Sequence, residues 1–187
     1  MDWHKRLGLM MFGLVLFRLI WGFIGSWTAR FLPMVRRLRS LKPYIGTLRN
    51  DDRPPSFGHS PLAVLSVFAL LLALATQVTT GLFSVDVDGL ESGPLAIWVS
   101  FDTGRQLAEI HEFNFNILAG LIGLHIMAIA TYHFLLGEKL VGPMITGRRT
   151  RADFSDTELS EARIRPLPMI VALMIALICV WGISTFG

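Results

Sequence analysis

Four long apolar segments constrain this chain more than any other feature of its sequence. They cover about residues 5–25, 62–83, 110–136 and 167–186, and the second and the fourth contain no charged side chain. About 20 apolar residues in a helix cross a hydrocarbon core that is roughly 30 Å thick. Hydrophobic residues make up 52% of the chain, which is high for a soluble domain of this length. We therefore predict an all-α fold, a polytopic membrane helical bundle with four transmembrane helices that forms a single domain over residues 1–187.

The distribution of charge predicts the orientation of this bundle. Lysine and arginine gather in residues 30–53 and 139–165, whereas the loop between them, residues 84–109, is acidic. Because loops rich in Lys and Arg stay on the cytoplasmic side, both termini are expected outside. The basic residues form no stripe suited to nucleic acid. The single cysteine, Cys179, excludes an internal disulfide, and the absence of a C-x-x-C-H motif excludes covalently attached haem.

His111 and His125 lie fourteen residues apart in the third apolar segment. In a helix this spacing turns the two side chains by only about 40° relative to each other and separates them by about 21 Å along the axis. One imidazole is thus expected near each leaflet. Imidazole is a common haem ligand, so the pair indicates a helix that carries two stacked haems. The alternative is two histidines that hydrogen-bond to neighbouring helices.

His4 and Arg18 repeat this fourteen-residue spacing in the first segment, which is expected to cross the membrane in the same direction. His4 should therefore share the depth of His111, and the two could clamp one haem. Arg18 should share the depth of His125. A buried guanidinium needs a partner, and a haem propionate can accept two parallel hydrogen bonds from it. The alternatives are an interfacial His4 and an Arg18 that extends towards the inner head groups.

Two further histidines are expected near the inner surface. His59 precedes the second segment, and His133 follows His125 by eight residues, which turns it away from the predicted haem stack. Either could bind a propionate, a quinone head group or water. Either could equally be an interfacial histidine with an ordinary hydrogen bond.

Several stretches of the chain resemble the bacterial b561-type membrane cytochromes, a family that includes the cytochrome b subunits of nickel-iron hydrogenases. The matching stretches are WHKRLGLMMFGLVLFRLIWGFIGSWTARF, GHSPLAVLSVFALLLALATQVTTGLF, EIHEFNFNILAGLIGLH and EKLVGPMITGRR. The resemblance implies a bundle in which histidines hold two b haems. It implies that His4 and His111 bind the outer haem iron, and that His125 is one ligand of the inner haem.

The chain departs from the family pattern at its start. Members usually begin with another spanning helix, whose R-x-x-H-W motif supplies the second ligand of the inner haem, and that motif does not occur here. Three accounts of the inner site follow. Another subunit supplies the histidine, the haem is five-coordinate, or the site holds no haem.

The sequence and the resemblance together favour an electron-transfer subunit of the bacterial inner membrane rather than a catalyst that makes or breaks bonds. It would pass electrons between a periplasmic redox partner and the quinone pool or a c-type cytochrome. A periplasmic cytochrome c or dehydrogenase could dock on residues 84–109, and other membrane subunits are expected. The main alternative is an accessory or structural subunit with few or no haems. A histidine-lined proton pathway is a third option, although the spans contain no Asp or Glu relay.

Overall fold

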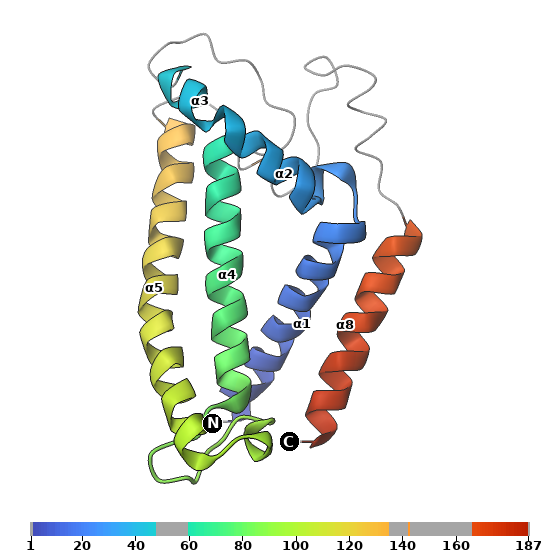
Figure 1. Ribbon diagram of the computed structural model, residues 1–187, viewed down its shortest axis with the longest axis vertical. Coiled ribbons are helices and arrows are strands. Elements are labelled where there is room, and N and C mark those ends of the chain that lie inside the picture. Colours follow the sequence, from blue (N-terminus) through green and yellow to red (C-terminus); the bar gives the residue numbers. More distant parts are fainter. Residues whose placement is uncertain (1, 48–59, 135–141, 143–165, 187) are drawn as a thin grey trace.

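The computed structural model describes residues 2–47, 60–134, 142 and 166–186, and Figure 1 shows that this part of the chain is helical. Four helices are long and apolar enough to span a membrane, which confirms the predicted all-α, four-helix fold. They are α1 (Asp2–Ile24), α4 (Pro61–Phe83), α5 (Phe101–Phe134) and α8 (Pro166–Phe186). His59, one of the predicted site residues, lies outside the described residues.

Capping residues explain where two of these helices begin. Pro61 occupies the first turn of α4, where its missing N–H costs nothing, and the Ser60 hydroxyl accepts a hydrogen bond from the Ala63 amide at 3.2 Å. Helix α5 begins nine residues before the predicted segment. There the Ser100 hydroxyl accepts from the Thr103 amide at 3.2 Å. Hydropathy marks the part of a helix that crosses the membrane, so the charged first turns of α5 were missed.

Helices α4 and α5 form the most closely paired part of the bundle, α1 packs against α4, and α8 packs against α1. The facing surfaces of α4 and α5 carry two matching stripes. Along α4 the stripe is Ser66, Ala73, Gln77 and Thr80, and along α5 it is His111, Asn114, Leu118 and His125. Four members of these stripes, Ala73, Thr80, Asn114 and Leu118, are buried. The histidine pair therefore faces a neighbouring helix rather than lipid.

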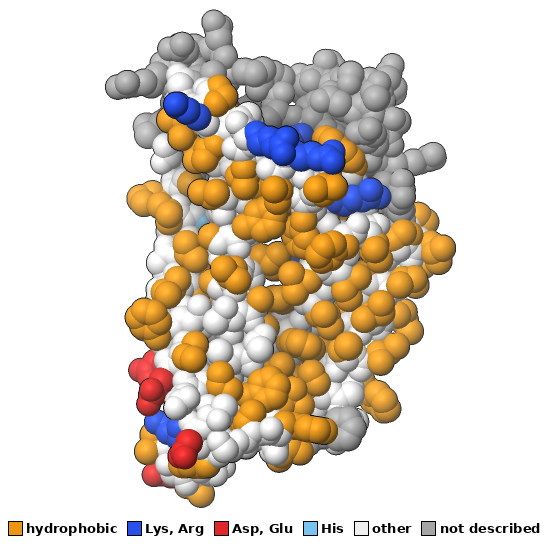
Figure 2. Space-filling view, viewed as in Figure 1, with side chains coloured by type: hydrophobic (Ala, Val, Ile, Leu, Met, Phe, Trp, Pro, Cys, Tyr) orange, Lys and Arg blue, Asp and Glu red, His pale blue; other side chains and the backbone are white. Residues whose placement is uncertain are grey.

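Short helices join α1 to α4 at one end of the bundle. They are η1 (Trp27–Ala29), α2 (Phe31–Arg37), η2 (Leu38–Ser40) and α3 (Leu41–Thr47). Figure 2 shows Lys and Arg side chains gathered over this region, Asp and Glu at the opposite end, and a broad apolar belt between them. Both termini lie at the acidic end (Figure 1). The charge asymmetry matches a bundle with α2 and α3 at the cytoplasmic surface.

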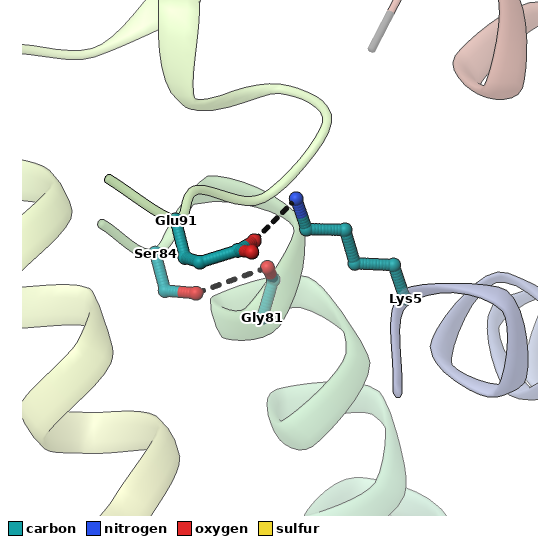
Figure 3. Close-up of polar contacts among 4 residues, drawn as sticks. All are labelled: Lys5, Gly81, Ser84 and Glu91. Atoms are coloured by element: carbon teal, nitrogen blue, oxygen red, sulfur yellow. Dashed lines mark hydrogen bonds and ion pairs between the residues drawn. The ribbon is translucent and has the colours of Figure 1, made fainter. Parts of the chain in front are cut away.

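The connection between α4 and α5 is compact and contacts α1. A single bridge pairs Val85 with Ser92 around a turn in which Gly89 adopts φ +68°, a conformation that favours glycine. Glu91 in this connection forms an ion pair with Lys5 of α1, with 2.8 Å between Lys5 Nζ and Glu91 Oε2 (Figure 3). The hydrogen bond and the positive charge of Lys5 lower the pKa of Glu91. The end of the connection contains η3 (Ala96–Trp98).

Candidate functional site

His4 and His111 come together from α1 and α5 at the acidic end of the bundle. Their ring centroids are 6.0 Å apart and their planes are inclined by 78°. A metal between two imidazoles, with metal–nitrogen distances of about 2 Å, would place the ring centroids roughly 6 Å apart. His4 and His111, which are predicted to share a depth, thus lie side by side with their rings at a spacing that would accommodate one iron. Their role as ligands stays a prediction.

Helix α4 holds His111 by both ring nitrogens. The Nδ1 atom lies 2.9 Å from the main-chain carbonyl oxygen of Gln77, and Nε2 lies 3.0 Å from the side-chain nitrogen of the same residue. The Thr80 hydroxyl is a further contact of Nδ1, at 3.2 Å. The ring packs on Gly81, where an added Cβ would stand only 2.8 Å from the His111 Cε1 atom. The packing of His111 therefore requires a small residue at position 81 of α4. The fourteen-residue spacing of the histidines did not predict this requirement.

The neighbouring hydrogen bonds fix the protonation of His111. Asn114 is buried, and its amide nitrogen donates to the Ala73 carbonyl at 2.9 Å and to the Gln77 side-chain oxygen at 2.6 Å. Because the Gln77 oxygen is used as an acceptor, its NH₂ group faces His111 and donates to Nε2. The ring proton therefore resides on Nδ1, which donates to the Gln77 carbonyl. This tautomer leaves a lone pair on Nε2, as metal ligation requires.

His125 is held by α4 in a similar way. Its Nδ1 atom lies 3.0 Å from the Ser66 hydroxyl. If Nδ1 donates to this oxygen, Nε2 again carries the lone pair. A hydroxyl can also donate, however, so Ser66 constrains the tautomer of His125 less strictly than a carbonyl would. The structure thus gives the two histidines of α5 comparable but unequal supports.

Arg18 of α1 lies against α2. Its guanidinium carbon is 5.0 Å from the centroid of the Phe31 ring, and one terminal nitrogen is 3.9 Å from the Met34 sulfur. The other terminal nitrogen, Nη1, is buried without a hydrogen-bond partner within the described residues. A side chain that extended to the inner head groups would instead expose this nitrogen to water or phosphate. The unpartnered N–H donors suit a carboxylate.

His133 lies in the last turn of α5, with its ring 4.9 Å from that of Phe134. Its Nδ1 atom is buried, and no partner for it is found in the described part of the chain. On the neighbouring residue, the Tyr132 hydroxyl is 3.1 Å from the Tyr44 hydroxyl of α3. These contacts place His133 beside the inner short helices. Its role as a place for a propionate or a quinone stays a prediction.

These residues fit the haem that the sequence predicts. The imidazoles of His4 and His111 stand at a spacing suited to one iron. The buried Nη1 atom of Arg18, which has no hydrogen-bond partner within the described residues, could donate to a propionate. Within the described residues no three His, Cys, Asp or Glu side chains gather into a metal cluster. The fit has one condition, which is that Gln77 must release Nε2 of His111.

Sequence reasoning named the two histidines of α5 but missed the residues of α4 that hold them. Ser66, Gln77 and Thr80 are uncharged, so a search for ionisable residues in apolar segments passes over them. One signal was present, because Ser66 and Thr80 are fourteen residues apart, the same spacing as His111 and His125.

Comparison with known proteins adds one finding. A family model described as prokaryotic cytochrome b561 matches residues 1–147, which include α1, α4 and α5. Neither the search of curated proteins nor the search of solved structures found a match.

Proposed function

The chain belongs to the prokaryotic cytochrome b561 family, and from this premise we propose that His4 and His111 hold a b haem at the outer end of the bundle. Members of this family bind haem b and transfer electrons in membranes, so a haem-binding membrane electron-transfer role follows from membership. The observation that carries the more specific proposal is the 6.0 Å spacing of the two rings.

The chain's own residues bind and orient the group. When bound, haem supplies reversible one-electron chemistry at its iron. The Gln77 carbonyl fixes the ring orientation of His111 and raises the basicity of its ligating nitrogen. The role of the protein is thus to position a redox group and set its potential, without bond-making chemistry of its own.

We propose that His125 binds a second haem on the inner side and that another membrane subunit completes its coordination. The Ser66 contact supports this, because it favours a lone pair on Nε2 of His125. The unpartnered nitrogen of Arg18 supports it further as a site for a propionate. Lower-ranked places for a propionate or a quinone are His133 and His59.

The proposed partners follow from the two ends of the bundle. A periplasmic cytochrome c or dehydrogenase would dock on the outer connection, where Ile97 and Trp98 are 76% and 72% exposed. Electrons would pass between this partner and the quinone pool or a c-type cytochrome. The proposed location is the bacterial inner membrane, with α2 and α3 on the cytoplasmic side.

A reduced-minus-oxidised spectrum of the purified protein tests the proposal. We expect a b-type α band, and its absence would overturn haem binding by this chain. His4→Ala and His111→Ala should each remove the same haem, whereas His125→Ala should spare it. Asn116→Ala serves as a matched control on α5, since the exposed Asn116 side chain bonds to the main-chain carbonyl of Glu112 on its own helix. Loss of the outer haem in His125→Ala would contradict the ligand assignment.

One observation favours the alternative of an accessory subunit with few or no haems. The ligating nitrogen of His111 already has a hydrogen-bond partner, the Gln77 amide at 3.0 Å. A histidine that served only to join α4 to α5 would look like this. Counting haem per chain in the intact complex separates the two functions, because the accessory role predicts a value near zero.

A further inference from the structure

We propose that Gln77 is a positioning residue that holds His111 ready for haem while occupying the nitrogen that the iron needs. This inference rests on the proposed haem at His4 and His111. Two hydrogen-bonding groups of Gln77 act on the same imidazole. Its main-chain carbonyl accepts a hydrogen bond from Nδ1 at 2.9 Å, and its side-chain NH₂ group donates to the Nε2 lone pair at 3.0 Å.

The two contacts have opposite consequences for haem binding. The carbonyl contact favours ligation, because it keeps the proton on Nδ1 and orients the ring. The amide contact opposes ligation, because one nitrogen lone pair cannot bond to a donor N–H and to iron together. The backbone of Gln77 therefore prepares the ligand, and its side chain must be displaced.

Asn114 makes the amide contact directional. A free glutamine could rotate its amide and present oxygen to His111. Here the Asn114 nitrogen donates to the Gln77 oxygen at 2.6 Å and to the Ala73 carbonyl at 2.9 Å. Rotation of the Gln77 amide would set two NH₂ groups against each other. Asn114 is 7% exposed, so water has little access to relieve that conflict.

Without haem, the amide contact removes a cost. A half-buried imidazole with an unsatisfied lone pair between two apolar helices would be unfavourable. The Gln77 amide satisfies that lone pair and keeps His111 in a single orientation. On loading, its hydrogen bond is exchanged for the bond to iron. The net strength of one hydrogen bond corresponds to about a twofold to tenfold change in an equilibrium constant.

Gln77→Leu tests the inference in the full chain, produced in a haem-deficient host and reconstituted in nanodiscs. Titration with haem should give a dissociation constant about twofold to tenfold lower than that of the wild type, because no donor competes for Nε2. The reduction potential should stay the same, since the main-chain carbonyl remains. Thr79→Val is the matched control, because Thr79 is an exposed residue of the same helix. It should change neither quantity.

Two further variants keep the test decisive. Gln77→Leu leaves an Asn114 donor without its acceptor, so the double variant Gln77→Leu/Asn114→Leu removes both partners and should also bind haem more tightly. Gln77→Glu replaces the donor with a carboxylate that can accept a proton from Nε2, and it should weaken haem binding. If the wild type binds haem and both leucine variants show an unchanged dissociation constant, the proposed role of Gln77 is wrong. The proposed haem at His4 and His111 would still stand.

A measurement on the haem-free chain separates this inference from the proposed function. Nitrogen-15 spectra of labelled histidine distinguish a proton on Nδ1 from one on Nε2. We expect the Nδ1 tautomer for His111 in the wild type, and a shift of the Nε2 resonance in Gln77→Leu as its donor is lost. A proton on Nε2 would overturn the inference. Failure of the wild type to bind haem would overturn the proposed function instead, whichever tautomer is found.

Discussion

A single methyl group added at Gly81 should displace His111, the proposed ligand of the outer haem. In Gly81→Ala the new Cβ would stand 2.8 Å from the Cε1 atom and 3.1 Å from the Nδ1 atom of His111. Carbon atoms in contact prefer about 3.5–4.0 Å, so the ring must recede by about 1 Å. The Nδ1 hydrogen bond to the Gln77 carbonyl, now 2.9 Å, would then stretch beyond useful range.

The sign of the stability change follows from three magnitudes. Alanine favours a helix over glycine by up to about 1 kcal/mol. Overpacking costs about 1–3 kcal/mol, and loss of the hydrogen bond costs about 0.5–1.5 kcal/mol more. The two costs outweigh the gain, which leaves a net destabilisation of about 2 kcal/mol on the central values. Most of this destabilisation comes from the displaced contacts of His111.

The control is Gly120→Ala, on α5 itself. Nothing lies within 4 Å of a Cβ added there. The propensity gain of up to about 1 kcal/mol is then unopposed, so this variant should be as stable as the wild type or more so, with its haem unchanged. The comparison separates a general effect of alanine in a helix from a contact with His111.

Haem content per chain and thermal unfolding in detergent are the measurements. Gly81→Ala should retain less outer haem and unfold at a lower temperature, whereas Gly120→Ala should do neither. Equal haem content and equal stability in Gly81→Ala would refute the close packing of His111 on α4. With that result the reasoning about its tautomer would fail as well.

Three other predictions concern charged groups away from the histidines. Arg18→Leu should lower the reduction potential of a nearby haem, because a positive charge that disfavours the ferric state is removed; Arg18→Lys should fall between it and the wild type in a redox titration. The pKa of Glu91 is lowered by Lys5 in the folded protein, so the contact stabilises above the unfolded pKa and is lost as pH falls through the folded value. Glu91→Gln should flatten the pH dependence of thermal unfolding in the acid range, and an unaltered profile would contradict it. Replacing Arg36 and Arg39 with glutamine should reduce the gain in thermal stability that anionic phospholipid produces over neutral phospholipid, because both side chains are exposed on the basic end of the bundle.

The fold could be predicted from sequence because the membrane imposes a simple requirement. A span must be apolar and helical over a fixed length, so the four segments were visible in the sequence as long apolar runs. The start of α5 was missed for the same reason. Its first turns carry Asp102 and Arg105, and they are helical through the Ser100 cap rather than through apolar composition.

The site was only partly predictable. Counting residues placed His4 level with His111, because equal numbers of helical residues from the same surface reach equal depth. Counting did not show what His111 would meet on α4. The partners of His111 include a main-chain carbonyl, which every residue possesses, and an uncharged amide. Because every residue has a main-chain carbonyl, the sequence does not show which carbonyl will contact His111. The register of α4 against α5 decides that.

That register nonetheless leaves a trace in the sequence. From Thr80 back to Ser66 the facing residues of α4 are three, then four, then seven positions apart, and from His111 on to His125 those of α5 follow the same steps. Antiparallel helices of equal rise bring such mirrored stripes into contact along their whole length. Contact of Thr80 with His111 at 3.2 Å therefore entails contact of Ser66 with His125, observed at 3.0 Å. A slip of one turn would remove both hydroxyls from both rings together. The two histidines are thus not independent sites, because α4 sets the orientation of each through a single register.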